Sequence, residues 1–239
     1  MTPLTTSLFK KSYRHLILLS FLLAATPLLA HKLHPEKYGV QMNFLNASSL
    51  VNALTVTKIL PPPPPEGSQK LLTDEETRTE VSSTATKNER QDAKNTPDSI
   101  FSFSTIIGSH FNSQELPEAD AFFKKVDDDT HTAIHIAKKT FERPRPLKPT
   151  GYDYPSGHST RAFVWESLLT EIFPKHQKEF EAKAKSMAWN RVILGHHYPS
   201  DISAGETYGR YLAQEFFKNP KFNQELATIK KELKEHLEL

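Results

Sequence analysis

Residues 117–141 read PEADAFFKKVDDDTHTAIHIAKKTF, and the spacing of their apolar side chains decides the fold class. Apolar residues recur there at mostly three- and four-residue intervals, which places them on one face of a helix. Pro144 and Pro146 follow and cannot continue a helix. We therefore predict a helix from Pro117 that buries one stripe, made of Phe123, Val126, Ala133, Ile134, Ala137 and Phe141.

Helical spacing continues on both sides of this segment. The polar stretch 71–95 is compatible with a helix, although its apolar face is thin. The short alternating runs of a β domain are missing, so the sequence predicts an all-α fold, a single-domain helical bundle with its active site at helix ends. Four further helices are expected: after Pro155-Ser156-Gly157 up to Pro174, from Gln177 to Leu194, from Ser200-Asp201, and from about Phe222.

The N-terminal residues 1–30 resemble a secretory signal peptide. Lys10, Lys11 and Arg14 form a basic region, and an apolar run from Leu16 to Ala30 follows it. An uncleaved N-terminal anchor is the alternative, although the apolar run is short for a membrane span. We expect secretion or a periplasmic location, and no later segment is expected to cross a membrane.

Residues 31–70 are predicted to form an extended N-terminal strap, because Pro61–Pro65 exclude helix and central strand. On composition alone, a surface linker is favoured for the pentaproline, and a ligand for a proline-binding module is the alternative. Residues 71–239 are assigned to the catalytic domain.

Composition excludes several classes of protein. The chain has no cysteine, which excludes disulfide scaffolds, thiol catalysis and cysteine metal sites. Thirty Lys and Arg balance 28 Asp and Glu, and no long basic stripe is present, so a nucleic acid partner is not expected. A site for a small anion stays open.

Three clusters of anion-binding residue types lie at the predicted helix ends. The first holds Lys138 and Arg145, which two prolines could bring together; a point charge and a planar guanidinium suit phosphate oxygens. A solvated pair that matches the helix dipole is the alternative. The second is Pro155-Ser156-Gly157-His158, where a helix start exposes backbone N–H donors and His158 could serve as a general acid. An ordinary serine cap beside an exposed histidine is its alternative.

The third cluster runs from Asn190 to Asp201 and contains Arg191 and His197. Asp201 opens the next helix within reach of the His197 imidazole, and a carboxylate that accepts from Nδ1–H leaves Nε2 free to attack. A metal pair or a simple polar loop is the alternative for His196-His197. Adjacent histidines do not face one another as ligands at helical spacing do, so we expect no metal.

Together the three clusters resemble the signature of the type 2 phosphatidic acid phosphatase superfamily, which also includes vanadium haloperoxidases. Lys138-x6-Arg145-Pro146, Pro155-Ser156-Gly157-His158 and Arg191-x5-His197-x3-Asp201 occur in the family's order. The signal-like segment, Ile59-Leu60 before the prolines and Gly195-His196-His197 are similar to one branch, the class A bacterial non-specific acid phosphatases. This resemblance covers nearly all of the chain beyond residue 30 and revises the pentaproline from a linker to an ordered strap.

The resemblance implies a role for each site residue. His197 is the implied nucleophile and forms a phosphohistidine, Asp201 orients it, and His158 protonates the leaving group. The implied phosphate-binding residues are Lys138, Arg145, Ser156, Gly157 and Arg191. No cofactor is implied, the substrates are small phosphomonoesters, phosphate or vanadate should inhibit, and transfer to other alcohols and a homo-oligomer are family-level expectations. With His158 protonated and His197 neutral, the rate should be bell-shaped with an acid-side maximum.

This sequence departs from the family pattern at a few positions. Asn190 stands where the family usually has serine. An amide can also donate to a phosphate oxygen or hold His158, so we expect altered affinity rather than loss of function. The segment from Leu147 to Asp153 is short, which would open the mouth of the pocket. Glu142 and Arg143 are expected to be solvated.

Three other functions remain open at this point. A lipid phosphate or diphosphate phosphatase shares the motifs, but those relatives have several membrane spans. A vanadate-dependent haloperoxidase would use the same cradle, with His197 as the metal ligand. A non-catalytic anion-binding protein would result if Asn190 had disabled the site.

Overall fold

The computed structural model describes residues 42–46, 53–147 and 151–237. The expected signal segment 1–30 and residues 148–150 of the short connection lie outside this part. Residues 32–239 form one compact unit, and the description concerns that unit. Its α-helices are α2 (Ala53–Ile59), α3 (Gln69–Thr84), α4 (Lys87–Asn95), α5 (Ser104–Ile107), α6 (Pro117–Phe141), α7 (Gly157–Ile172), α8 (Gln177–Ile193), α9 (Pro199–Phe217) and α10 (Pro220–His236).

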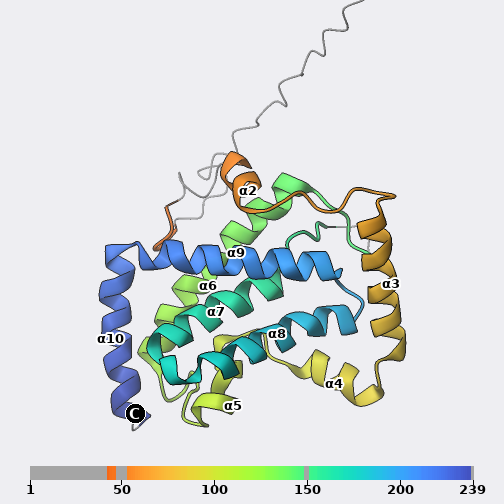
Figure 1. The fold of residues 1–239 in the computed structure, drawn as a ribbon. Coiled ribbons are helices and arrows are strands. Elements are labelled where there is room, and N and C mark those ends of the chain that lie inside the picture. The colour runs from red at the N-terminus through yellow and green to blue at the C-terminus, as the bar shows by residue number, and fades with distance from the viewer. Residues whose placement is uncertain (1–41, 47–52, 148–150, 238–239) are drawn as a thin grey trace, which may run out of the picture. The chain divides into compact units, whose positions relative to one another are not determined.

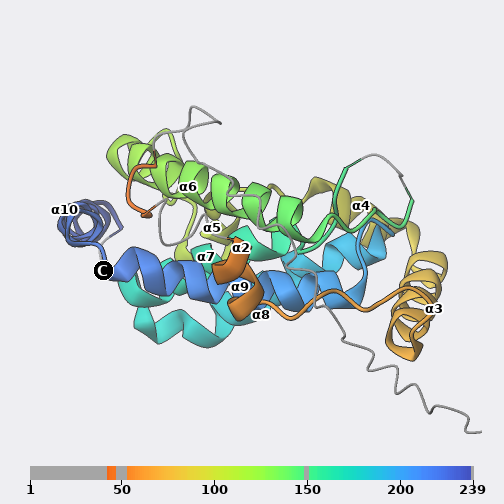
Figure 2. The ribbon, with the colours of Figure 1, turned by 90° about the horizontal axis from the view of Figure 1, so that it is seen from above.

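The predicted all-α fold is confirmed. Helices α6, α7, α8 and α9 lie beside one another, and α3 and α10 stand at opposite ends of α9 (Figure 1). Seen from above, α6 runs along one side of α9 and α10 crosses the end of both (Figure 2). The described residues contain no strand, only an isolated antiparallel bridge between Pro144 and Tyr152.

The apolar stripe predicted for residues 117–141 forms the buried face of α6. Phe123, Val126, Ala133, Ile134 and Ala137 are buried, and Phe141 is partly buried. At its N-terminal end, α6 contributes Phe122 to an aromatic cluster with Phe44, Phe216 and Phe222. Buried aromatic rings supply large apolar areas and prefer tilted or edge-on contacts. This cluster joins α6, α9 and α10 far from the sequence motifs.

Two glycines allow α9 to lie directly against α7. A Cβ added at Gly205 would approach the Ser159 side chain to 2.6 Å and the carbonyl oxygen of Ser156 to 2.8 Å. A Cβ at Gly209 would lie 2.4 Å from the carbonyl oxygen of Thr160. Because Ser156 precedes α7, the close approach at Gly205 fixes the start of α7 against α9. The backbone N–H of Ser156 also donates to the carbonyl of Asp201, 3.0 Å away.

Replacing Gly209 with alanine should destabilise the fold although alanine is the better helix former. Helix propensity alone would favour alanine by about 1 kcal/mol. The added methyl meets backbone, so we expect a net loss of about 2 kcal/mol or more in the free energy of unfolding. Urea unfolding measures it, with exposed Ser203→Ala on the same helix as the control. A more stable Gly209→Ala variant would contradict the close α7–α9 contact.

The segment predicted to be an extended strap contains a short helix, which corrects that expectation. Ala53–Ile59 form α2, because helical spacing lets Val56 and Leu60 be buried against the bundle. The prolines then lead from α2 toward α3 along α9 (Figure 1). The Tyr154 hydroxyl donates to the Pro61 carbonyl at 2.7 Å, which ties this segment to the residue before the Pro155-Ser156-Gly157-His158 motif.

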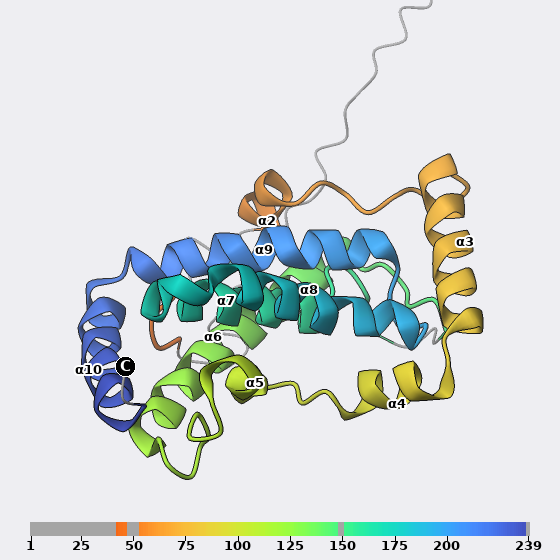
Figure 3. The same cartoon turned by 60° about the horizontal axis from the view of Figure 1, so that its bottom comes forward.

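The polar stretch 71–95 is two helices rather than one. Thr86 separates α3 from α4 and forms a capping box with Glu89, so a new helix starts there. Helix α3 lies across the ends of α8 and α9, and α4 lies beside α8 (Figure 3). The position of α3 against the loop between α8 and α9 could not be predicted from this polar sequence.

Candidate active site

Four segments meet at one end of the bundle. They are the C-terminus of α6, the connection 142–156, the N-terminus of α7 and the loop between α8 and α9. The bridge between Pro144 and Tyr152 folds the connection back on itself, and the Asp153 N–H donates to the Arg143 carbonyl at 2.8 Å. The three sequence clusters are thereby brought together.

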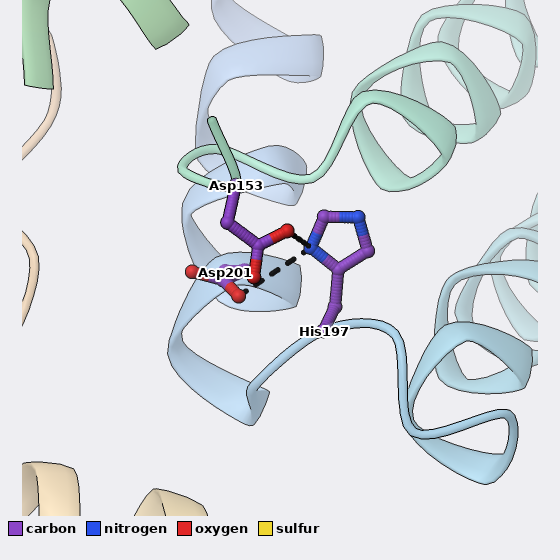
Figure 4. Close-up of side chains that lie close together, drawn as sticks. All are labelled: Asp153, His197 and Asp201. Carbon is purple, nitrogen blue, oxygen red and sulfur yellow. Dashed lines mark hydrogen bonds and ion pairs between the residues drawn. The ribbon is translucent and has the colours of Figure 1, made fainter. Parts of the chain in front are cut away.

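His197 lies at the centre of this region and is 3% exposed. Its Nδ1 lies 2.7 Å from Asp153 Oδ1 and 3.4 Å from Asp201 Oδ2 (Figure 4). Both carboxylates are fully buried. With Nδ1 facing carboxylates, the proton belongs on Nδ1 and the lone pair on Nε2. This is the tautomer that a nucleophilic histidine needs.

Asp201 is held by two donors besides His197. Arg143 Nη1 lies 2.8 Å from its Oδ1, and the Tyr198 N–H donates to its Oδ2 at 2.8 Å. Burial acts to raise the pKa of Asp201, but the hydrogen bond and charge of His197 and the charge of Arg143 outweigh it and keep that pKa below its usual value. Asp201 is therefore an ionised, fixed group at the start of α9.

Arg143 is buried, and its predicted solvation is wrong. Only 8% of it is exposed, its Nη1 also donates to Ser200 Oγ at 3.0 Å, and its guanidinium lies over the Tyr198 ring, 4.4 Å from the centroid. The sequence could not reveal this, because the partners are nearly sixty residues away. Glu142 is exposed as expected and accepts from the Tyr152 hydroxyl at 2.9 Å.

Lys138 and Arg145 both lie close to Asp153. Lys138 Nζ donates to the carbonyls of Tyr152 and Asp153 at 3.0 and 2.9 Å, and burial lowers its pKa to about 8 against the opposing charge of Asp153. A third ammonium N–H meets no acceptor among the described residues. Arg145 Nε lies 4.0 Å from Asp153 Oδ1, and its side chain is 40% exposed. Arg145 is therefore accessible to a ligand.

Arg191 ends α8 beside the same site. Its Nη2 lies 2.6 Å from His196 Nδ1, while its buried Nε has no hydrogen-bond partner among the described residues. Burial and the charge of Arg145 lower its pKa. A buried guanidinium nitrogen without a partner is a donor available to an anion.

Asn190 contacts the segment that follows α4. Its Nδ2 donates to Thr96 Oγ1 at 3.0 Å, so it ties α8 to the residue after α4. A role in binding phosphate or holding His158 stays a prediction that this geometry does not support directly.

Ser156 and Gly157 begin α7 as the sequence predicted. The buried Ser156 hydroxyl accepts from the Ser159 N–H at 3.4 Å, which is an N-cap contact. The first N–H groups of α7 lack helical acceptors and point out of the helix start. A Cβ added at Gly157 would lie 3.5 Å from the Ile134 side chain, which is an ordinary van der Waals contact.

His158 faces a carboxylate that the sequence did not single out. Its Nε2 lies 3.2 Å from Asp98 Oδ2, and Asp98 also pairs with Arg161. Burial and then the charges of Arg191, His197, His196 and Lys138 lower the pKa of His158 to about 3. His158 is therefore neutral without a ligand, which differs from our expectation of a protonated group. An anion among these cations, together with Asp98, would favour its protonated form.

A cavity of about 220 Å³ adjoins His158 and Arg191. Its wall includes Thr96, Asp98 and Asn190, so it is polar where it meets the site. A leaving group in this cavity would have its oxygen next to His158, the position that a general acid requires.

Among the described residues, one group has the residue types and spacing of a metal site. The ligand atoms of Asp153, His197 and Asp201 lie within 4.8 Å of one another, and all three residues are buried. Arg143 already neutralises Asp201, which reduces the attraction for a second cation. That the site works without a metal stays a prediction, and activity in the presence of a chelator tests it.

Comparison with known proteins agrees with this geometry. Residues 127–225, which run from within α6 to within α10, match the profile of the PAP2 superfamily. Over this stretch the chain is similar to the PAP2 superfamily. The matched region contains every site residue named above except Asp98 and Thr96.

Several named proteins are similar to this chain. It is 28% identical over 148 residues to a non-specific acid phosphatase of Salmonella typhimurium, covering 55% of this chain and 59% of that protein. It is 25% identical over 146 residues to a non-specific acid phosphatase of Providencia stuartii, covering 54% and 59%. A lipid A 1-phosphatase of Rhizobium johnstonii is 37% identical over 60 residues, covering 25% of each chain. The chain thus spans less than two thirds of the length of these relatives.

None of the described helices is both long enough and apolar enough to cross a bilayer.

Proposed function

We propose that this protein is an acid phosphatase that hydrolyses small phosphomonoesters through a phosphohistidine on His197, without a metal. The observation that carries the proposal is the environment of His197: Nδ1 faces two buried carboxylates, and Lys138, Arg145 and Arg191 surround the same site. The names of the two Salmonella and Providencia relatives support the reaction class.

The first half of the reaction transfers the phosphoryl group to His197. The lone pair on Nε2 attacks phosphorus as the bond from phosphorus to the alcohol oxygen breaks. Lys138, Arg145 and Arg191 offset the charge on the equatorial oxygens, which is the main contribution that a protein makes to phosphoryl transfer. The proton for the leaving oxygen comes from His158.

His158 must gain this proton when the substrate binds, because its pKa in the free protein is about 3. A phosphomonoester monoanion carries one proton and can supply it once its charge lies among the cations. In the second half, His158 takes a proton from water, water attacks phosphorus, and the N–P bond breaks. A rate maximum on the acid side of neutrality follows, since the monoanion is depleted at higher pH.

The experiment is hydrolysis of p-nitrophenyl phosphate by the full chain between pH 4 and 9, with and without EDTA. We expect turnover with an acid-side maximum that EDTA leaves unchanged. Inorganic phosphate and vanadate should inhibit competitively. No turnover, together with bromide oxidation when vanadate and peroxide are added, would favour the haloperoxidase alternative instead.

A lipid phosphate is the second candidate substrate, and the Rhizobium lipid A 1-phosphatase is the observation that favours it. The two candidates differ in where the ester is presented. Turnover of phosphatidic acid in vesicles at a kcat/KM above that of soluble esters would reverse our preference. We also propose a periplasmic or secreted location, which cell fractionation with an antibody to the chain would test.

A further inference from the structure

Asp153 is a buried carboxylate for which the reaction proposed above has not yet given a role. It lies in the connection between α6 and α7, two residues before Pro155, and is fully buried. Its Oδ1 is 2.7 Å from His197 Nδ1, yet neither oxygen forms a well-aligned hydrogen bond with a described residue. Figure 4 shows its carboxylate beside the imidazole, reaching the ring from a different segment than Asp201 does. A buried carboxylate without a well-aligned hydrogen-bond donor needs an explanation.

Asp201 is the more distant of the two carboxylates from Nδ1, although its contact is the better aligned of the two. Its contact with Nδ1 is 3.4 Å, which exceeds the usual 2.7–3.2 Å of an N–H···O hydrogen bond. Its oxygens already accept from Arg143 and from the Tyr198 N–H, both at 2.8 Å. Asp201 therefore makes its shortest hydrogen bonds with Arg143 and with the backbone at the start of α9. Asp153 has the shorter contact with His197.

We propose that Asp153 is a positioning residue: its ionised carboxylate accepts the Nδ1 proton of His197, keeps Nε2 unprotonated for attack, and stabilises the positive charge of the phosphorylated ring. The inference rests on the proposed function and assigns Asp153 the role that the sequence motif alone would give to Asp201. Asp201 then fixes the loop between α8 and α9 through its contacts with Arg143 and the Tyr198 N–H.

The balance of charge in the reaction explains the need for this carboxylate. When Nε2 bonds to phosphorus, the Nδ1 proton stays in place and the ring becomes a cation. The P–O bond breaks, and His158 supplies the proton to the alcohol oxygen. When water later displaces Nε2, the ring returns to neutral. Asp153 stays ionised throughout and faces the ring at the stage when the ring is charged.

Several charged groups face Asp153 and set its ionisation. Lys138 comes from α6, Arg145 from the connection, Arg191 from α8, and His197 and Asp201 from the α8–α9 loop and α9. Burial raises the pKa of Asp153 to about 6, with the hydrogen bond and charge of His197 opposing and Asp201 adding to the rise. Activity should therefore fall as the pH drops through about 6 and Asp153 becomes protonated.

The test compares Asp153→Asn with the wild type in the full chain. We expect kcat for p-nitrophenyl phosphate to fall about 10²- to 10⁴-fold, because an amide can donate to Nδ1 and favour the wrong tautomer. The KM and the dissociation constant for inorganic phosphate should change less than threefold. The decline of activity near pH 6 should be absent from the pH profile of the residual activity.

Two further readouts do not depend on turnover. Nitrogen NMR of the His197 ring should show a proton on Nδ1 in the wild type and a mixture of tautomers in Asp153→Asn. The variant should also melt at a higher temperature than the wild type at pH 8, because the folded wild type then holds an ionised carboxylate that burial disfavours. Asp74→Asn, which changes a buried carboxylate on α3, is the matched control and should leave the pH profile unchanged.

The outcomes separate this inference from the proposed function. An active wild type whose Asp153→Asn variant keeps kcat within threefold and the same acid limb would overturn the inference alone. An inactive wild type would overturn the function, while NMR and melting still test the contact. Loss of wild-type activity in EDTA and its recovery with Zn²⁺ would make the carboxylates metal ligands and overturn the inference.

Discussion

Replacing His197 with alanine should lower kcat for p-nitrophenyl phosphate at least about 10⁴-fold, because the variant lacks the proposed nucleophile for the first half of the reaction. Binding of inorganic phosphate should change much less, since Lys138, Arg145 and Arg191 remain. Calorimetric titration with phosphate measures this second quantity. A large loss of kcat with a preserved dissociation constant is the pattern of a group that acts in the transition state.

The same prediction has a direct chemical readout. Wild-type protein that is quenched rapidly with p-nitrophenyl phosphate should gain the mass of one phosphoryl group, and His197→Ala should not. His197→Asn is a second variant that keeps a donor toward Asp153 and guards against loss of folding. His236→Ala changes an exposed histidine at the end of α10 and is the control for the loss of an imidazole. Turnover of His197→Ala at the wild-type rate would refute the proposed mechanism.

The helices of the bundle could be predicted because their signals are local. Prolines and glycine bound each segment, and apolar residues at helical spacing mark the buried faces of α6, α7, α9 and α10. The motif residues lie at the end of α6, the start of α7, the end of α8 and the start of α9, so predicting the helix ends also located the site. Polar α3 was predicted as a helix, but its place over the α8–α9 loop was not, since it depends on contacts such as Tyr198 with Glu75 and Arg78.

Of the carboxylates near His158 and His197, only one could be predicted from the sequence. Asp201 was found because it lies four residues from His197, within the reach of a single turn. Asp153 is 44 positions away and arrives only because the connection folds back through the Pro144–Tyr152 bridge. Its one local sign is a charge between two tyrosines in front of the Pro155-Ser156-Gly157-His158 motif. Asp98 lies sixty residues before His158 and carries no such sign.

The second large effect is expected at Arg143, and it concerns stability. Arg143→Met should lower the free energy of unfolding by about 3–5 kcal/mol, because it leaves Asp201 as a buried charge without its main partner. The long apolar side chain of methionine can still contact the Tyr198 ring, so loss of packing is a minor part. Urea unfolding at pH 7 measures the change. Activity should fall as well, since Asp201 fixes the loop that carries His197.

Arg145 provides the matched comparison, because it lies two residues away and is 40% exposed. Arg145→Met should change the free energy of unfolding by less than about 1 kcal/mol while it weakens phosphate binding. The double variant Arg143→Met with Asp201→Asn should recover much of the stability lost by Arg143→Met alone, since the buried charge is then absent. Equal destabilisation by both arginine variants, or no recovery in the double variant, would contradict this reading of Arg143. The difference in burial between the two neighbouring arginines would then have no energetic consequence.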